Sequence, residues 1–210
     1  HLGNQIEASL HQFPSDFVNY LEHTTPVIAC FSNFTWNSCL SYDFATRIKE
    51  VHPDSIIVFG GPQYPLEQKE QEAYLRSHPS IDFFIFREGE QAFVELFNRL
   101  SDYQFSVKNF KSSRIKSPNC HYLFEDNLVI GDLLTPIKDL DEIPSPYLTG
   151  LCDHLLEKGS IPIIQTKKGC PFKCTFCEDG HDHFNRIRRF SLDRVKQEIE
   201  YIAKRTPSSS

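Results

Sequence analysis

The sequence predicts an α/β fold built on a parallel sheet, because apolar segments of strand length alternate with helical segments over its first hundred residues. The three strand segments lie at 26–34, 55–61 and 81–86. They are apolar on both faces, which is typical of parallel strands covered by helices on two sides. We therefore expect a doubly wound sheet with right-handed crossovers.

The helical segments follow the strands in order. We expect them at 37–53, 67–79 and 89–100, with an earlier helix at 15–22. The third is the most regular, because its apolar residues recur at helical spacing: Phe93, Leu96, Phe97 and Leu100. Such a stripe predicts a helix packed on the sheet.

Three loops follow the predicted strands at their carboxyl ends, where open α/β sheets bind ligands. Their glycines allow a close approach of backbone to a ligand, or a positive φ, although turn formation alone would also explain them. The candidate binding residues in these loops are Asn33, Trp36, Gly60, Gly61, Pro62, Glu88, Gly89 and Glu90.

The middle of the chain differs from the first hundred residues. Residues 121–131 predict a β-hairpin that turns at 125–127. A segment rich in proline and acidic residues follows, with a short helix near 151–157. We therefore divide the chain into an α/β domain at 1–104, a hairpin and linker at 105–160, and a third part at 161–210.

The third part repeats the strand, loop and helix order. We expect a strand at 161–166, a cysteine-containing loop, and a helix at 191–205 capped by Ser191. The expected apolar stripe of this helix is Leu192, Val195, Ile199 and Ile202.

Cys170, Cys174 and Cys177 lie within eight residues at C-x3-C-x2-C spacing, as "GCPFKCTFC". A redox pair would use only Cys174 and Cys177. A structural zinc site needs four ligands, and His181 or His183 could supply the fourth. A [4Fe–4S] cluster usually takes four thiolates, so three would leave one iron open.

This motif, directly after a predicted strand, resembles the signature loop of radical S-adenosylmethionine (SAM) enzymes. The resemblance implies that the three cysteines each bind one iron of a [4Fe–4S] cluster. It implies that SAM chelates the fourth iron and that Phe176 packs near the adenine of SAM. It further implies that an electron carrier such as flavodoxin or ferredoxin reduces the cluster.

The first hundred residues and the linker resemble the cobalamin-binding domain that precedes the barrel in one branch of the radical SAM family. The segments that carry this resemblance are "PVIACFSNFTWN", "PDSIIVFGGP", "HPSIDFFIFREGEQAFVEL" and "LDEIPSPYLTG". The implied fold is a Rossmann-like (flavodoxin-like) cobalamin-binding domain followed by the start of a partial (β/α) barrel. Loops 32–37, 60–64 and 87–90 would line the corrin site.

The sequence departs from the family pattern in two respects. The usual Asp-x-His-x-x-Gly motif is absent, so no lower ligand of cobalt can be named. Only one unit of the barrel is visible and the sequence contains no methionine, so we expect an N-terminal fragment that is inactive alone. No catalytic residue or substrate is assigned, and methyl transfer to a small molecule is the favoured reaction.

Two alternatives remain open: a zinc-stabilised binding module, and a radical SAM enzyme whose first domain docks a substrate or carrier protein without cobalamin. The net charge of −6 argues against general nucleic-acid binding. Residues 158–210 are nevertheless basic, with 11 Lys and Arg against 6 Asp and Glu. No apolar run could span a membrane, and the cysteine usage favours a reducing cytoplasm.

Overall fold

The computed structural model describes residues 6–175, 177 and 186–206. The chain divides into two compact units. The first, called here the sheet unit, contains Asn19–Pro136, and the second, the cysteine-loop unit, contains Asn4–Val18 and Ile137–Ser210. Helix α1 (Pro14–His23) crosses the boundary between the two and confirms the helix expected at 15–22.

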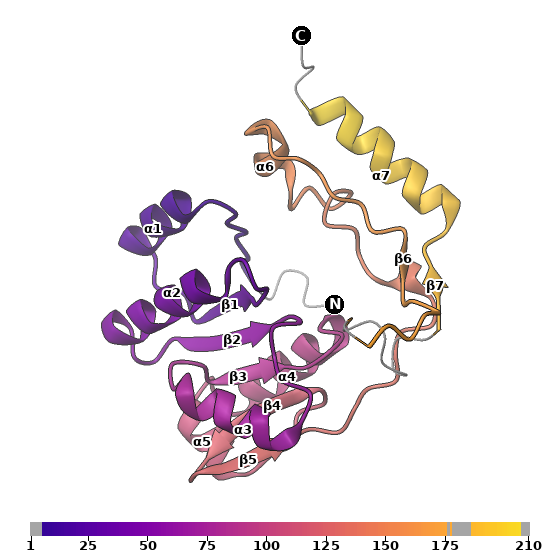
Figure 1. The fold of residues 1–210 in the computed structure, drawn as a ribbon. Coiled ribbons are helices and arrows are strands. Elements are labelled where there is room, and N and C mark those ends of the chain that lie inside the picture. The colour runs from indigo at the N-terminus through magenta and orange to yellow at the C-terminus, as the bar shows by residue number, and fades with distance from the viewer. Residues whose placement is uncertain (1–5, 176, 178–185, 207–210) are drawn as a thin grey trace. The chain divides into compact units, whose positions relative to one another are not determined.

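A five-stranded sheet with the order β1-β2-β3-β4-β5 forms the sheet unit (Figure 1). Strands β1 (Ile28–Ser32), β2 (Ile56–Gly60) and β3 (Phe83–Ile85) are parallel and match the three predicted strands. Strands β4 (Cys120–Phe124) and β5 (Asn127–Ile130) continue the sheet in antiparallel fashion. The predicted α/β class is confirmed.

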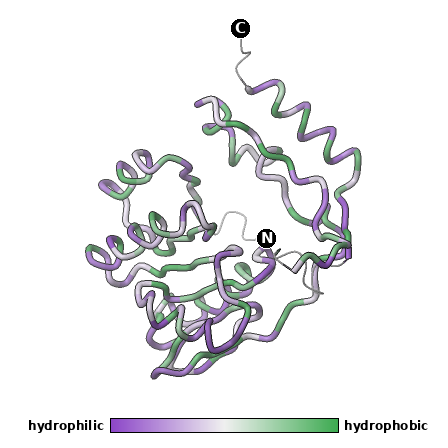
Figure 2. The backbone as a smooth tube through the Cα atoms, in the orientation of Figure 1, coloured by the Kyte–Doolittle hydropathy of each residue, from purple (hydrophilic) through white to green (hydrophobic). Residues whose placement is uncertain are grey.

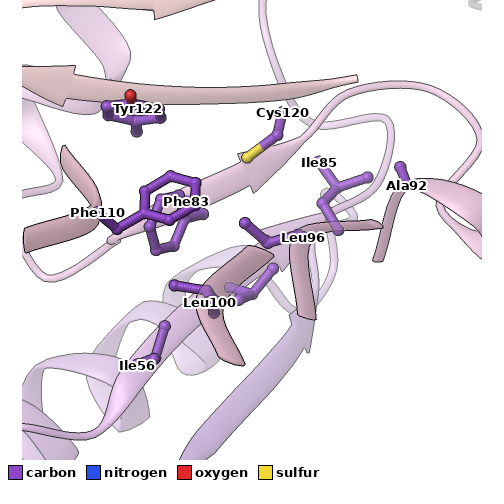
Figure 3. Packing of buried hydrophobic residues seen from close by; sticks show 10 residues of the cluster. Ile56, Phe83, Ile85, Ala92, Leu96, Leu100, Phe110, Cys120 and Tyr122 are labelled. Carbon is purple, nitrogen blue, oxygen red and sulfur yellow. The ribbon is translucent and has the colours of Figure 1, made fainter. Parts of the chain in front are cut away.

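Helices cover both faces of this sheet. On one face α4 (Glu90–Asp102) and α5 (Val107–Ser112) pack on alternate residues of β2, β3 and β4 (Figure 3). The buried cluster there is Ile56, Val58, Phe83, Ile85, Ala92, Leu96, Leu100, Phe110, Cys120 and Tyr122. Helices α2 (Ser38–Val51) and α3 (Gln68–Ser77) join successive parallel strands, and right-handed crossovers place both on the opposite face. Tyr74 of α3 meets Phe84 there, with ring centroids 6.0 Å apart.

The predicted hairpin exists but belongs to the sheet rather than to the linker. Strand β4 pairs with β3, and Ile85 lies opposite Cys120. The first three residues of β4 are buried, so it contributes to both faces, whereas an isolated hairpin is marginally stable in water. Glu125 and Asp126 form the turn, both with positive φ (47° and 60°), as a two-residue turn of type I′ requires.

The cysteine-loop unit holds a 3₁₀ helix at Leu140–Glu142, α6 (Asp153–Glu157) and α7 (Leu192–Arg205). The predicted N-cap is confirmed, because Ser191 accepts a hydrogen bond from the Arg194 backbone N–H. Tyr201 of α7 donates to Asp153 of α6 at 2.9 Å. Figure 2 shows polar and apolar residues alternating along α7.

The strand expected at 161–166 was wrong. Those residues have no regular structure, and Ile161 and Ile163 are 87% and 82% exposed. A short antiparallel ribbon lies just beyond, between β6 (Lys167–Lys168) and β7 (Arg188–Arg189). A strand needs a neighbour for its backbone hydrogen bonds, and no described segment pairs with 161–166.

Among the described residues, no helix is both long enough and apolar enough to cross a membrane.

Candidate functional site

The loop after β1 is anchored by Asn33, which is fully buried although it is polar. Its backbone N–H donates to the Gly60 carbonyl at 2.7 Å, and its own carbonyl accepts from the Gln63 N–H at 3.0 Å. Its side-chain Nδ2 donates to the Gln63 carbonyl and, at 3.0 Å, to the Tyr74 hydroxyl. The structure thus brings the first two predicted loops together at the carboxyl edge of the sheet.

Residues 60–62 begin the second loop as predicted. Gly61 has φ +134° and lies so close to Asn33 that a Cβ there would approach the Asn33 carbonyl oxygen to 2.6 Å. Gly60 ends β2 beside Ile85 of β3, and Pro62 is exposed. Gly61 therefore serves the close contact between the loops, which turn formation alone would not require.

Tyr64 fixes the end of the second loop on the sheet. Its ring stacks on Phe84 with centroids 3.8 Å apart, and its hydroxyl lies 3.3 Å from Nδ1 of His121. Burial lowers the pKa of His121 to about 4, with a smaller contribution from the Arg87 guanidinium. The imidazole is therefore neutral at pH 7. Phe86, which follows β3, packs against the His121 ring with centroids 5.2 Å apart. It thereby joins the third loop to Tyr64 and His121.

The third loop contains Glu88, Gly89 and Glu90. Gly89 is the N-cap of α4, and Glu90 lies in its first turn, where the helix dipole favours a carboxylate. Asn119 holds this loop, because its Nδ2 donates to the Glu88 carbonyl at 3.1 Å and its Oδ1 accepts from Leu134 N–H.

Trp36 is the most exposed of the predicted residues. It is 81% exposed, and its ring stacks on Phe34 with centroids 4.6 Å apart. It presents a flat apolar surface on the first loop, at the edge where Asn33 is buried. Its ring is accessible to a ligand at this edge, where open α/β sheets bind ligands.

Several residues of this edge were missed by sequence reasoning. Gln63, Tyr74, Asn119 and His121 all hold the three loops through hydrogen bonds or ring contacts. Tyr74 lies in a polar helix, and Asn119 and His121 precede or begin a hairpin assigned to another segment. Gln63 lies inside the loop 60–64 expected to line the corrin site, although it was not singled out there.

The three predicted metal ligands lie on the loop after β6. Cys170 is half-buried, Cys174 and Cys177 are exposed, and all three thiols are free. The Cys177 N–H donates to the Cys174 carbonyl at 3.2 Å. Within the part of the chain that the structure describes, no three potential ligands are gathered into one metal-binding group. The donors have the chemistry that iron requires, but they are not assembled around a common point.

The remaining predicted residues of this loop cannot be placed. Phe176, the candidate SAM contact, lies outside the described residues, as do His181 and His183, the candidate fourth zinc ligands. The ribbon beside the loop is strongly basic, since Lys167 pairs with Arg189 and Lys168 with Arg188. Arg188 donates to the Ile137 carbonyl at 2.7 Å.

Comparison with known proteins gives similarities over most of the chain. No protein-family model matches the chain. The cobalamin-dependent radical SAM methyltransferase TokK of Streptomyces tokunonensis is 30% identical over 186 residues, which cover 85% of this chain and 26% of TokK. Over most of its length the chain is therefore similar to a radical SAM enzyme that depends on cobalamin, as the sequence motifs predicted. The chain spans about a quarter of the length of the curated relatives it matches.

Solved structures support the fold. The apo form of OxsB, a cobalamin-dependent SAM radical enzyme, matches with a TM-score of 0.60 and 21% identity, over 90% of this chain and 24% of that one. The radical SAM methyltransferase TsrM of Kitasatospora setae, solved with cobalamin and a [4Fe–4S] cluster, matches with a TM-score of 0.56 and 14% identity. That match covers 90% of this chain and 37% of TsrM.

Proposed function

We propose that this chain is the cofactor-binding part of a radical SAM enzyme, in which Cys170, Cys174 and Cys177 hold a [4Fe–4S] cluster. The observation that carries the proposal is the set of three free thiols at C-x3-C-x2-C spacing on one loop of a chain similar to a radical SAM enzyme. Two of the thiols are exposed and can reach an incoming cluster without unfolding the unit. Thiolates are the usual ligands of such clusters.

Held by Cys170, Cys174 and Cys177, a cluster would supply the electron for reductive cleavage of SAM. Phe176 is the residue that we assign to the adenine of SAM, on the resemblance to the family motif. The ribbon formed by β6 and β7 places cationic side chains next to the cluster loop. Positive charge close to a cluster favours its reduced form.

We also propose that a corrinoid binds at the carboxyl edge of the sheet. The residues assigned to it are Asn33, Trp36, Gly60, Gly61, Pro62, Glu88, Gly89 and Glu90. Two features of this edge suit a ligand: a buried acceptor on Asn33 that no described donor reaches, and the exposed Trp36 ring. A buried polar atom of that kind is uncommon in a native fold unless a ligand or water meets it.

Methyl transfer to a small molecule is the reaction that we favour for the complete protein, because TokK is a methyltransferase by name. An acidic electron carrier such as flavodoxin or ferredoxin would suit the basic ribbon, since opposite charge speeds encounter. We place the protein in the cytoplasm, where thiols that must bind iron stay reduced.

The test is anaerobic reconstitution of the whole chain with iron and sulfide, followed by metal analysis and an absorbance spectrum. We expect a brown protein with about four irons per chain. The Cys170→Ala, Cys174→Ala, Cys177→Ala triple variant should lose the iron, whereas Cys39→Ala, at another exposed thiol, should keep it. Stoichiometric zinc in a colourless protein would instead favour the Cys3His binding module.

Titration of the same protein with hydroxocobalamin tests the second site. Saturable binding supports the corrinoid assignment. A protein that holds its cluster but binds no corrinoid would favour the alternative in which the sheet unit is a docking module.

A further inference from the structure

The side-chain amide of Asn33 is held in one orientation. Its Nδ2 faces the carbonyl oxygen of Gln63, which can only accept, so the nitrogen and not the oxygen must lie on that side. The second Nδ2 hydrogen is directed to the Tyr74 hydroxyl at 3.0 Å. Both donors of the amide are therefore used, and the position of Oδ1 follows from them.

The Oδ1 of Asn33 is buried, and no donor in the described part of the chain reaches it. Leaving a buried acceptor unsatisfied destabilises the folded chain, because the group has lost its hydrogen bonds to water. Asn33 lies directly after β1, at the carboxyl edge where α/β sheets bind ligands. The unsatisfied acceptor therefore lies at the predicted binding edge of the sheet.

The surroundings of this amide are neutral. Tyr74 stacks on His78 with ring centroids 4.2 Å apart and meets Tyr64 edge-on at 5.2 Å. Burial raises the pKa of Tyr74, and the hydrogen bond from Asn33 opposes this rise. The hydroxyl is protonated at pH 7, so the group that holds Asn33 carries no charge. A neutral N–H donor suits these buried surroundings better than an ammonium group, which burial would penalise.

We propose that Asn33 Oδ1 accepts a hydrogen bond from a primary amide on the rim of a corrin ring, and that Tyr74 is the positioning residue that orients Asn33 for it. This inference rests on the proposed corrinoid site. Corrinoids carry acetamide and propionamide side chains around the ring, and their NH₂ groups are neutral donors. The bond would satisfy the buried acceptor only when the ligand is present.

The amide must enter between the first two loops. An exposed hydrogen bond joins these loops, from Thr35 Oγ1 to Gln63 Oε1 at 2.8 Å. It is a bond between neutral side chains in water, which contributes little to stability and can open at low cost. Opening it frees the Thr35 and Gln63 side chains at the surface, while the backbone and Nδ2 hydrogen bonds between Asn33 and Gln63 remain.

The test compares hydroxocobalamin with its derivatives in which one side-chain amide is hydrolysed to a carboxylate. A carboxylate offers no donor at neutral pH, so the derivative altered at the contacting amide should bind the natural sequence about tenfold more weakly. Binding is followed by quenching of Trp36, the single tryptophan of the chain, which lies on the same loop as Asn33. The readout needs neither a cluster nor turnover.

Two variants show whether Asn33 causes the difference in affinity between hydroxocobalamin and its hydrolysed derivative. Asn33→Leu should bind the parent and that derivative with affinities within about twofold of each other, because the acceptor is gone. Tyr74→Phe keeps the ring and loses the anchor, so it should reduce the tenfold difference by several-fold. The control is Tyr42→Phe, because Tyr42 packs edge-on against the same His78, with centroids 4.6 Å apart, from α2. It should leave the difference unchanged.

Equal binding of every derivative by the natural sequence overturns the inference, and so does a tenfold difference that persists in Tyr74→Phe and Asn33→Leu. If Asn33→Leu does not fold, the Tyr74→Phe result decides. Failure of the natural sequence to bind any corrinoid is a distinct result, which overturns the proposed corrinoid site and this inference with it.

Discussion

Gly61 lies directly against the backbone of Asn33. A Cβ built on Gly61 would be 2.6 Å from the Asn33 carbonyl oxygen and 2.9 Å from its nitrogen. Both are backbone atoms, and both are tied to the second loop or to β2 by hydrogen bonds, so neither can move freely. The contact joins the loops after β1 and β2 into one structure at the carboxyl edge of the sheet.

Gly61→Ala should therefore destabilise the sheet unit by about 2–4 kcal/mol, because it adds both a clash and a strained φ of +134°. Urea denaturation followed by Trp36 fluorescence measures this. The matched control is Gly60→Ala, since a Cβ at the adjacent glycine meets Ile85 only at ordinary distances of 3.5 Å and more. Its effect should stay below about 1 kcal/mol. Equal losses in the two variants would contradict the close contact.

The sequence was sufficient for the sheet because each parallel strand is apolar on both faces. Ile56 and Val58 pack under α4, and Ile57 and Phe59 are buried with them. The segment 161–166 looks equally apolar, yet Ile163 is 82% exposed. Apolar composition shows that a segment could be a strand, but whether a partner strand lies beside it depends on residues distant in sequence.

The sequence predicted which loops hold the candidate binding residues, because loops after parallel strands bind ligands. It did not predict the contacts that hold these loops in place. Tyr74 lies in a helix read as polar, and it reaches Asn33 across 41 positions of sequence. His121 comes from a hairpin that pairs with β3. A single sequence does not specify such distant pairs, whereas the local spacing of Cys170, Cys174 and Cys177 is visible at once.

The buried His121 predicts acid sensitivity of the sheet unit. Its folded-state pKa of about 4 lies below the ordinary value of 6.5, chiefly because burial disfavours the charged ring. Between these values the unfolded chain binds a proton that the folded chain does not. Stability is therefore complete above about pH 6.5 and falls as the pH decreases toward 4, by at most about 1.4 kcal/mol per pH unit from this residue.

The measurement is the free energy of unfolding at several pH values from 4 to 8, from denaturant curves followed by Trp36 fluorescence. His121→Phe removes the titrating ring, and the aromatic neighbours Phe86 and Tyr64 can accommodate the new one. The variant should lose the part of the slope that lies between pH 4 and 6.5. An unchanged slope in the variant would show that His121 is not responsible.

The hairpin turn offers a stabilising substitution. Glu125 has φ +47°, a conformation that favours Asn and Gly over Glu. Its ion pair with Arg114 is 3.3 Å long and exposed at both ends, so its loss costs little. Glu125→Asn should raise the free energy of unfolding by about 0.5–1 kcal/mol. Glu125→Val should instead lower it, because a β-branched residue is strained at positive φ.

In α7 the apolar stripe expected from the sequence is only partly buried. Leu192 and Ile199 are 77% and 52% exposed, whereas Ile202 and the charged Glu198 are buried. Glu198 accepts from Arg194 Nε at 2.8 Å, and Arg194 also donates to the Ile143 carbonyl at 3.1 Å. The buried side of α7 thus holds an ion pair between two of its own residues, and Arg194 also joins the helix to the Ile143 carbonyl.

Removing one partner of the Arg194–Glu198 ion pair should destabilise α7 more than replacing both partners with apolar residues. Arg194→Met leaves the Glu198 carboxylate, 10% exposed, without its partner, and should destabilise α7 by about 3 kcal/mol. Adding Glu198→Leu should recover most of that loss, because no uncompensated charge remains buried. Hydrogen exchange of the α7 amides reports the local stability in each variant. A double variant no more stable than Arg194→Met alone would show that the contact between Arg194 and Ile143, rather than the buried charge, holds the helix.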